Sequence, residues 1–126
     1  MVLHDFHFDV TPEKYQQFIT VSDDVHPLHT NAEFAQNLGF PAVVVHGNLL
    51  SCFVSNIVGM KLQLEDVMIV NQSINFRKPI FLNDHLVATL KIKEKLDFLP
   101  GYELTFKFMR DNDLVANGSI LIKTSA

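Results

Sequence analysis

The segment from Gly47 to Met60 is apolar on nearly all of its sides, and it constrains the fold more than any other feature. An amphipathic surface helix would show a continuous polar face, and this segment shows none. We therefore expect one long, buried helix with a sheet wrapped about it. Its apolar side chains are Leu49, Leu50, Cys52, Phe53, Val54, Ile57 and Val58.

Strand-like runs lie on both sides of this helix. Alternating apolar residues mark a strand at 2–10, and four further runs follow the helix at 67–77, 85–97, 102–110 and 114–123. The last four resemble a β-meander. Because strands and helices are segregated along the chain, the sequence predicts an α+β fold with an antiparallel sheet.

Two shorter helices are predicted between the first strand and the buried helix. Thr11, Pro12 and Glu13 form a helix start, with a hydroxyl at the N-cap, proline at N1 and a carboxylate in the first turn. That helix should end near Val21 or Ser22. A second should run from Asn31 to Leu38, with Gly39 as its C′ residue.

Size and composition favour one soluble domain spanning residues 1–126. The net charge is −4 and the basic residues are scattered, which argues against nucleic acid as a partner. The N-terminus lacks the pattern of a signal peptide, and no apolar run is long enough for a membrane span. We expect a cytoplasmic protein whose lone cysteine, Cys52, is buried and inert.

A single sheet wrapped on a helix leaves strand edges unpaired. Pairing edge to edge with a second copy would satisfy their backbone groups. The sequence therefore predicts a homodimer or a higher homo-oligomer.

The segment from Ser22 to His29 carries the most chemistry, with two carboxylates and two imidazoles in a loop held by a proline. Asp24 and His29 on a fixed loop could share a water as general base and general acid. Alternatively, Asp24 is a solvated turn residue and His29 lines the following helix. A zinc site built on Asp24, His26 and His29 is disfavoured, since no paired i,i+4 histidines are present.

Gly47 stands at the start of the buried helix, where backbone N–H groups lack partners. Such a helix end can hold a carbonyl oxygen that gains negative charge during a reaction. Alternatively, Gly47 only permits a tight entry into the helix, and His46 before it is a satisfied core histidine.

These motifs together resemble the MaoC-like (R)-specific enoyl-CoA hydratases, a family with the hot-dog fold. The resemblance rests on Asp24-Val25-His26-Pro27-Leu28-His29, on Ala35, on Gly39-Phe40-Pro41 and on Val45-His46-Gly47. It extends to Asn71–Phe76, Pro79, Phe81 and Asp84, and so covers nearly the whole chain.

The resemblance implies roles for individual residues. Asp24 and His29 match the catalytic pair that holds a water, and the N–H of Gly47 matches the donor to the thioester oxygen. It also implies that four residues line the substrate site: His26, His46, Ser55 and Val58. No metal and no cofactor are expected.

The chain departs from the family pattern at two positions. Asp23 replaces a glycine, and two adjacent carboxylates that lie close together should raise the pKa of one of them. His26 replaces an asparagine and so removes an amide that helps to hold the loop, although a neutral imidazole can still donate one hydrogen bond and accept another.

The predicted function is an (R)-specific hydratase or dehydratase. It would interconvert trans-2-enoyl and (R)-3-hydroxyacyl thioesters of CoA or an acyl carrier protein through a water activated by Asp24 and His29. Two alternatives stay open: a hot-dog thioesterase, and a non-catalytic module that binds acyl thioesters.

Overall fold

A computed structural model describes residues 2–125, with side chains from Asp5 onward. Five strands form one antiparallel sheet: β1 (Val2–Asp9), β2 (Val67–Phe76), β3 (His85–Lys95), β4 (Gly101–Arg110) and β5 (Asp113–Thr124). The helices are α1 (Pro12–Ser22), α2 (Pro27–Thr30), α3 (Ala32–Asn37) and α4 (Leu49–Asn56), and a π-helical turn, η1 (Ile57–Lys61), extends α4.

The strand order is β1-β3-β4-β5-β2. The predicted strands are therefore confirmed to within a few residues, but the predicted meander is wrong for one of them. Only β3, β4 and β5 follow one another as neighbours, and β2 lies at the far edge beside β5. The place next to β3 that a meander would give to β2 is taken by β1.

An irregularity interrupts β2 between Ile69 and Asn71. Val67 and Ile69 turn toward the core before it, and Gln72 and Ile74 do so after it. A β-bulge inserts one residue and so shifts the alternation of faces. Gln72 consequently points inward, where its amide donates a hydrogen bond to Ser51 Oγ on α4 at 3.2 Å.

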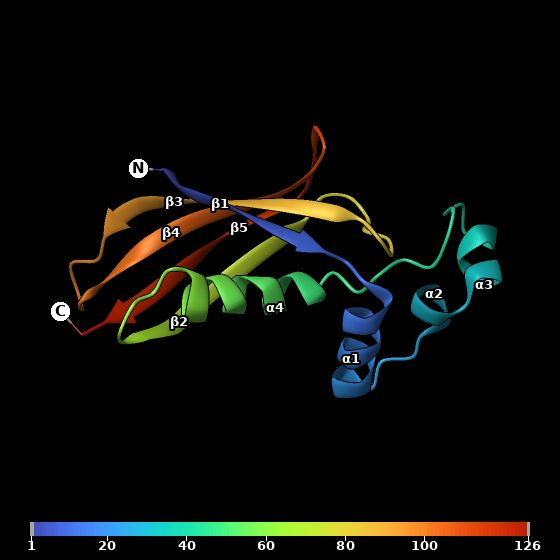
Figure 1. The fold of residues 1–126 in the computed structure, drawn as a ribbon, viewed down its shortest axis with the longest axis horizontal. Coiled ribbons are helices and arrows are strands. Elements are labelled where there is room, and N and C mark those ends of the chain that lie inside the picture. Colours follow the sequence, from blue (N-terminus) through green and yellow to red (C-terminus); the bar gives the residue numbers. More distant parts are fainter. Residues whose placement is uncertain (1, 126) are drawn as a thin grey trace.

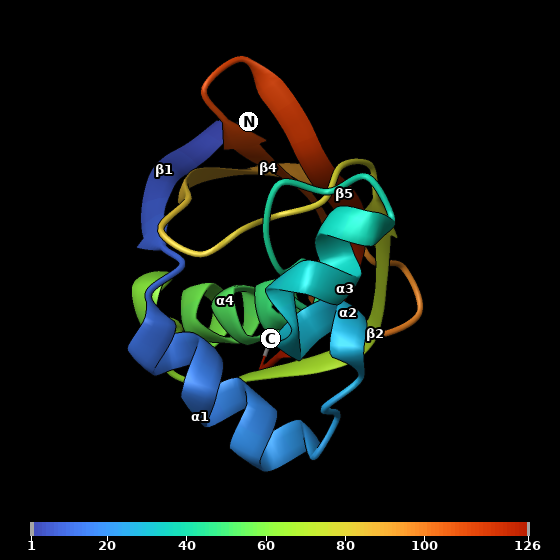
Figure 2. The same cartoon turned by 90° about the vertical axis from the view of Figure 1, so that its right-hand side faces the viewer.

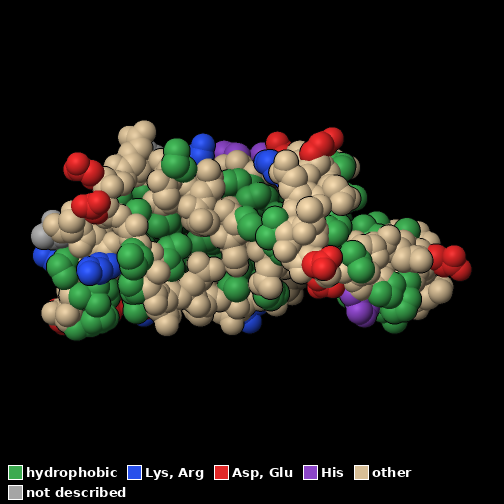
Figure 3. All heavy atoms as spheres, turned by 90° about the horizontal axis from the view of Figure 1, so that it is seen from below, with side chains coloured by type: hydrophobic (Ala, Val, Ile, Leu, Met, Phe, Trp, Pro, Cys, Tyr) green, Lys and Arg blue, Asp and Glu red, His purple; other side chains and the backbone are tan. Residues whose placement is uncertain are grey.

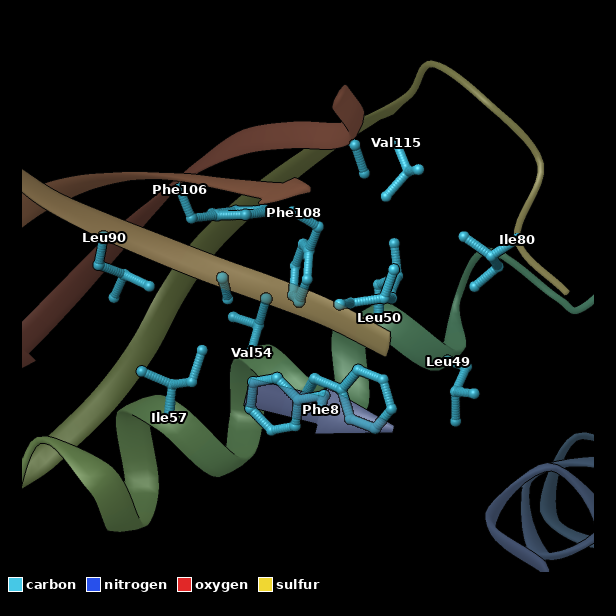
Figure 4. Close-up of a cluster of buried hydrophobic side chains, with 14 of the residues drawn as sticks. Phe8, Leu49, Leu50, Val54, Ile57, Ile80, Leu90, Phe106, Phe108 and Val115 are labelled. Carbon is cyan, nitrogen blue, oxygen red and sulfur yellow. The ribbon is translucent and has the colours of Figure 1, made fainter. Parts of the chain in front are cut away.

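The sheet curls around α4, so that the helix lies in its concave side (Figures 1 and 2). Side chains from both elements fill the space between them (Figure 4). Leu50 and Val54 of α4 and Phe108 of β4 are each at most 1% exposed. This burial explains why so apolar a helix forms here, because each large apolar side chain removed from water contributes about 1.5–3 kcal/mol.

The predicted burial of the helix is confirmed on the side that faces the sheet. The sheet covers one side of α4, and the other side leaves Cys52, Ser55 and Gly59 exposed. Cys52 is thus exposed rather than buried, in a groove of about 280 Å³ between α1 and α4. Seen from below, hydrophobic side chains reach the surface over much of this face (Figure 3).

The predicted N-cap of α1 is confirmed, and the helix predicted from Asn31 to Leu38 is found as α3, one residue shorter at each end. Thr11 Oγ1 accepts from the backbone N–H of Lys14 at 3.1 Å, and α1 ends at Ser22. Asn31 caps α3 by accepting from Phe34 N–H at 3.0 Å, and Gly39 follows in a left-handed conformation with φ of 96°.

We call the segment from Asp23 to Pro41, which carries α2 and α3, the arm. It projects beyond the sheet and α4 (Figure 1). Within it only Ala35 is buried. Across the part of the chain that the structure covers, no helix has the length and hydropathy needed to cross a membrane.

Candidate active site

The candidate site lies where the arm meets the start of α4. Two hydrogen bonds tie the arm to the segment leading into that helix: Val44 N–H donates to the Leu28 carbonyl at 3.1 Å, and the Val44 carbonyl accepts from His29 Nδ1 at 2.5 Å. The predicted residues Asp24 and His29 thus come from the arm, and His46 and Gly47 come from the helix start.

Asp24 follows a sharp change of chain direction at the end of α1. Asp23 caps that helix in a left-handed conformation, with φ of 55°. The Oδ1 atom of Asp24 accepts from the backbone N–H of His26 at 3.1 Å, and Oδ2 lies 3.0 Å from His46 Nε2. The His26 N–H, followed by His46, lowers the pKa of Asp24. The expected upward shift from the neighbouring carboxylate is therefore wrong for Asp24, which stays ionised.

His26 holds the loop through its side chain and its backbone. Its Nδ1 accepts from Leu28 N–H at 3.1 Å and so caps α2, while its own backbone N–H holds Asp24. The imidazole must be unprotonated at Nδ1 to accept this bond. Its predicted contact with substrate stays a prediction.

His29 is held in one tautomer by its partner. The Val44 carbonyl can only accept, so Nδ1 of His29 carries the proton. In the neutral ring Nε2 is then an acceptor. Asp24 and His29 therefore both present proton acceptors.

His46 is buried, at 7% exposure. Its ring stacks on His29 with centroids 3.7 Å apart, and Nδ1 lies 2.6 Å from the Tyr15 hydroxyl oxygen. Burial lowers the pKa of His46, and His29 adds to this shift while Asp24 opposes it. The ring is therefore neutral at pH 7.

Sequence reasoning missed Tyr15. The helix periodicity marks it as a core-facing residue of α1, and its side chain is 4% exposed. No spacing rule links it to His46, which lies 31 positions away. Its hydroxyl meets the site only because α1 packs beside the start of α4.

The backbone at Gly47 has the features predicted for an oxyanion site. Among the described residues, no backbone hydrogen bond is made by the N–H groups of His46, Gly47 or Asn48. A Cβ at Gly47 would lie 2.6 Å from Cε1 of Phe76, so a larger residue fits only if this ring moves. Both readings of Gly47, a donor and a tight packing position, fit the structure.

A pocket of about 350 Å³ opens beside this N–H group. His29 and Gly47 line it together with residues of the segment from Phe76 to Ile80. Leu50 of α4 closes its inner side. Asp24 is not among the lining residues.

Two predicted substrate contacts lie away from this cluster. Val58 is 2% exposed and lies within the core. Ser55 lies on the uncovered side of α4. Their roles, like the substrate contact of His46, stay predictions.

The donor atoms of Asp24, His29 and His46 all lie within 4.8 Å of one another, a spacing that a metal ion could use. An imidazole nitrogen binds a metal through a lone pair in the plane of its ring. The two rings are nearly parallel, at 23°, so their lone pairs run side by side rather than toward one point. The ring geometry therefore does not favour an ion held by both histidines.

Comparison with protein families identifies the family of the chain. A model of the family described as MaoC-like domain matches residues 3–100. The match covers more than half of the chain and includes every candidate site residue. That residues 1–126 form one domain stays a prediction.

Two curated relatives are named (R)-specific enoyl-CoA hydratase. The one from Aeromonas caviae is 29% identical over 84% of this chain and 80% of its own length. The one from Rhodospirillum rubrum is 33% identical over 60% of this chain, which spans about half, 52%, of that protein.

Among solved structures, the chain resembles the (R)-hydratase from A. caviae involved in PHA biosynthesis. The TM-score is 0.88, with 24% sequence identity, over 98% of this chain and 94% of the other. This likeness establishes the hot-dog fold, in which an antiparallel sheet wraps a central helix.

Proposed function

Because the chain belongs to the MaoC-like domain family, we propose that it is an (R)-specific hydratase or dehydratase of acyl thioesters. Its substrates would be trans-2-enoyl and (R)-3-hydroxyacyl thioesters of CoA or an acyl carrier protein. One observation carries the proposal. The fold brings two proton acceptors, Asp24 and His29, next to a helix start whose N–H groups are unpartnered among the described residues.

The thioester carbonyl would bind at the start of α4. There the Gly47 N–H donates to its oxygen, and the positive end of the helix stabilises charge that develops on it. The pocket beside Gly47 is mostly apolar and would hold the neighbouring part of the substrate.

The reacting water would lie between Asp24 and His29. It donates one hydrogen to the Asp24 carboxylate and the other to Nε2 of His29. In hydration the water oxygen forms the bond to C3, and one of its protons passes to Asp24. Asp24 then delivers a proton to C2. Dehydration is the reverse.

Substitution of Asp24 by asparagine tests the base. The change keeps the shape and removes the charge, so we expect a loss of at least about 100-fold in rate. Asp23→Asn is the matched control, because asparagine tolerates the left-handed backbone of that position. Activity of Asp24→Asn within tenfold of wild type would contradict the assignment.

The reaction itself is tested with crotonyl-CoA, by following the loss of enoyl absorbance and the configuration of the product. Formation of (R)-3-hydroxybutyryl-CoA supports the proposal. Release of free CoA thiol would instead identify a thioesterase, and binding without turnover of any enoyl-CoA would identify a non-catalytic module.

We also propose that the protein pairs with a second copy through β2. This strand pairs with β5 on one side only, and Met68, Val70 and Phe76 on it are 62%, 44% and 52% exposed. An edge strand with exposed apolar side chains pairs readily with another. Light scattering should show a dimer for wild type and a monomer for Val70→Lys. A wild-type monomer would refute this arrangement.

The protein is expected to act in the cytoplasm, as the sequence indicated, and this location stays a prediction.

A further inference from the structure

A buried polar pair stands behind the candidate site, and the proposed reaction does not use it. The Tyr15 hydroxyl contacts His46 Nδ1 at 2.6 Å and the His29 carbonyl at 3.2 Å. Tyr15 and His46 are 4% and 7% exposed. Burying two such polar groups costs free energy unless they form a hydrogen bond with each other. The direction of that hydrogen bond decides which nitrogen of His46 carries the proton.

Two proton arrangements fit these distances. In the first, Tyr15 donates to Nδ1 of His46, and Nε2 carries the imidazole proton toward Asp24. In the second, Nδ1 of His46 donates to the Tyr15 oxygen, and Tyr15 donates to the His29 carbonyl. The neutral ring then turns a bare Nε2 lone pair toward the Asp24 carboxylate.

The first arrangement is favoured by the charge on Asp24. The second arrangement sets a lone pair against an ionised carboxylate at 3.0 Å, which is repulsive. It is relieved only by protonating His46, and burial opposes that charge by lowering the pKa of His46.

The tyrosine proton is available for this bond. Burial, with the Asp24 charge, raises the pKa of Tyr15 to about 12, so the hydroxyl stays protonated at neutral pH. The groups that face His46 are Tyr15 from α1, Asp24 and His29 from the arm, and the uncharged ring of Phe18.

We propose that Tyr15 and His46 form a positioning pair, in which the Tyr15 hydroxyl holds His46 in the tautomer whose Nε2–H faces Asp24. Asp24 is then oriented through both oxygens, by the His26 N–H at Oδ1 and by His46 at Oδ2. This role rests on the proposed function, and neither residue need touch the substrate.

The Nε2–H of His46 is not well aligned with the carboxylate, since Nε2 is buried without an aligned hydrogen-bond partner among the described residues. Asp24 itself is half exposed and can move. The pair therefore acts on the carboxylate chiefly through the dipole of the neutral Nε2–H group, and it limits the directions in which the carboxylate can swing.

Tyr15→Phe tests the pair by removing one hydroxyl and little volume. We expect kcat to fall about 10-fold, as for other groups that orient a reacting group, with KM changed less than about twofold. Tyr102→Phe is the matched control. Tyr102 packs against the core, and its hydroxyl makes no hydrogen bond among the described residues. Equal kcat values for wild type and Tyr15→Phe would overturn the proposal.

Nitrogen-15 NMR of the His46 ring provides a readout independent of turnover. Wild type should show the neutral tautomer protonated at Nε2, and Tyr15→Phe should show a mixture. A wild-type ring protonated at Nδ1 would overturn the positioning pair even if the enzyme is active. An inactive wild type with the expected tautomer would instead count against the proposed function alone.

Discussion

The space between α4 and the sheet is filled by side chains such as Leu50 and Phe108, which are 1% and 0% exposed, whereas the arm buries only Ala35. The arm keeps its form through local polar contacts instead. Asn31 caps α3, His26 caps α2, and Thr30 Oγ1 donates to the carbonyls of Val25 and His26.

Most of the buried core and two of the candidate site residues thus lie in different regions of the molecule. Segments with few buried apolar contacts open locally at low free energy, while the core opens only with the whole domain. We call the rest of the chain, outside the arm, the body. Asp24 and His29 lie on the arm, and His46 and Gly47 lie on the body. The site therefore depends on the few bonds that join the two regions.

The largest effect is expected in the body. Phe108→Ala empties a fully buried site between the sheet and α4, and Phe→Ala changes in cores cost about 3–5 kcal/mol. We expect urea denaturation to show an unfolding free energy lower by this amount.

The matched change in the arm is Phe34→Ala. Phe34 is 38% exposed and touches His26 edge to face. Its loss should change the unfolding free energy by no more than about 0.5 kcal/mol. Equal losses of unfolding free energy in Phe108→Ala and Phe34→Ala would contradict this difference in packing between the arm and the body.

Gly47→Ala probes the junction. The added methyl group meets Phe76, but this ring is 52% exposed and can turn away, so we expect a loss of about 1 kcal/mol, the low end for overpacking. Activity should fall more, since both residues line the pocket. Gly59→Ala is the control. Nothing lies within 4 Å of its new methyl group, and we expect a gain of about 0.4–1 kcal/mol.

His26→Ala removes the cap of α2 and should cost about 1 kcal/mol, as lost N-caps do. Because the arm is thinly packed, the loss should appear as faster hydrogen exchange at the Leu28 amide, with little change in global unfolding. His26→Asn restores a good cap and should restore slow exchange. Fast exchange in both variants would argue against the capping role.

The smallest effect concerns pH. His46 has a pKa below its ordinary value of 6.5, so the unfolded chain binds more protons than the folded one between the two values. Stability should therefore fall as the pH drops from 7 through 6.5 toward the lower folded pKa. His46→Gln should flatten this part of the curve. The depressed pKa of Asp24 adds a loss at lower pH, below 3.8. An unchanged slope near pH 6 in His46→Gln would contradict this origin.

Local signals in the sequence predicted local structure well. Thr11 caps α1 as expected, a helix starts beside Asn31, and His29 of the Asp24–His29 motif lines the same pocket as Gly47. These features depend on neighbours in the chain, where hydroxyls, prolines and alternating side chains act over a few residues.

Long-range pairing was not predictable in the same way. The position of β2 beside β5 depends on which edge β1 occupies, and the contact of Tyr15 with His46 depends on how α1 packs. The exposure of Cys52 reflects which side of α4 the sheet covers. Periodicity measures how apolar a segment is and carries no information on its partner.

The pairing of β1 with β3 also sets an order of folding. Its register joins Val2 to Lys91, whereas β3, β4 and β5 form consecutive hairpins. Contacts distant in sequence close slowly, because the entropy of a long loop is lost before they are made. We therefore expect the three-stranded hairpin unit to form first and β1 to dock late. Since α1 follows β1 directly, Tyr15 would reach His46 only in the last steps, and the site would be assembled after its scaffold.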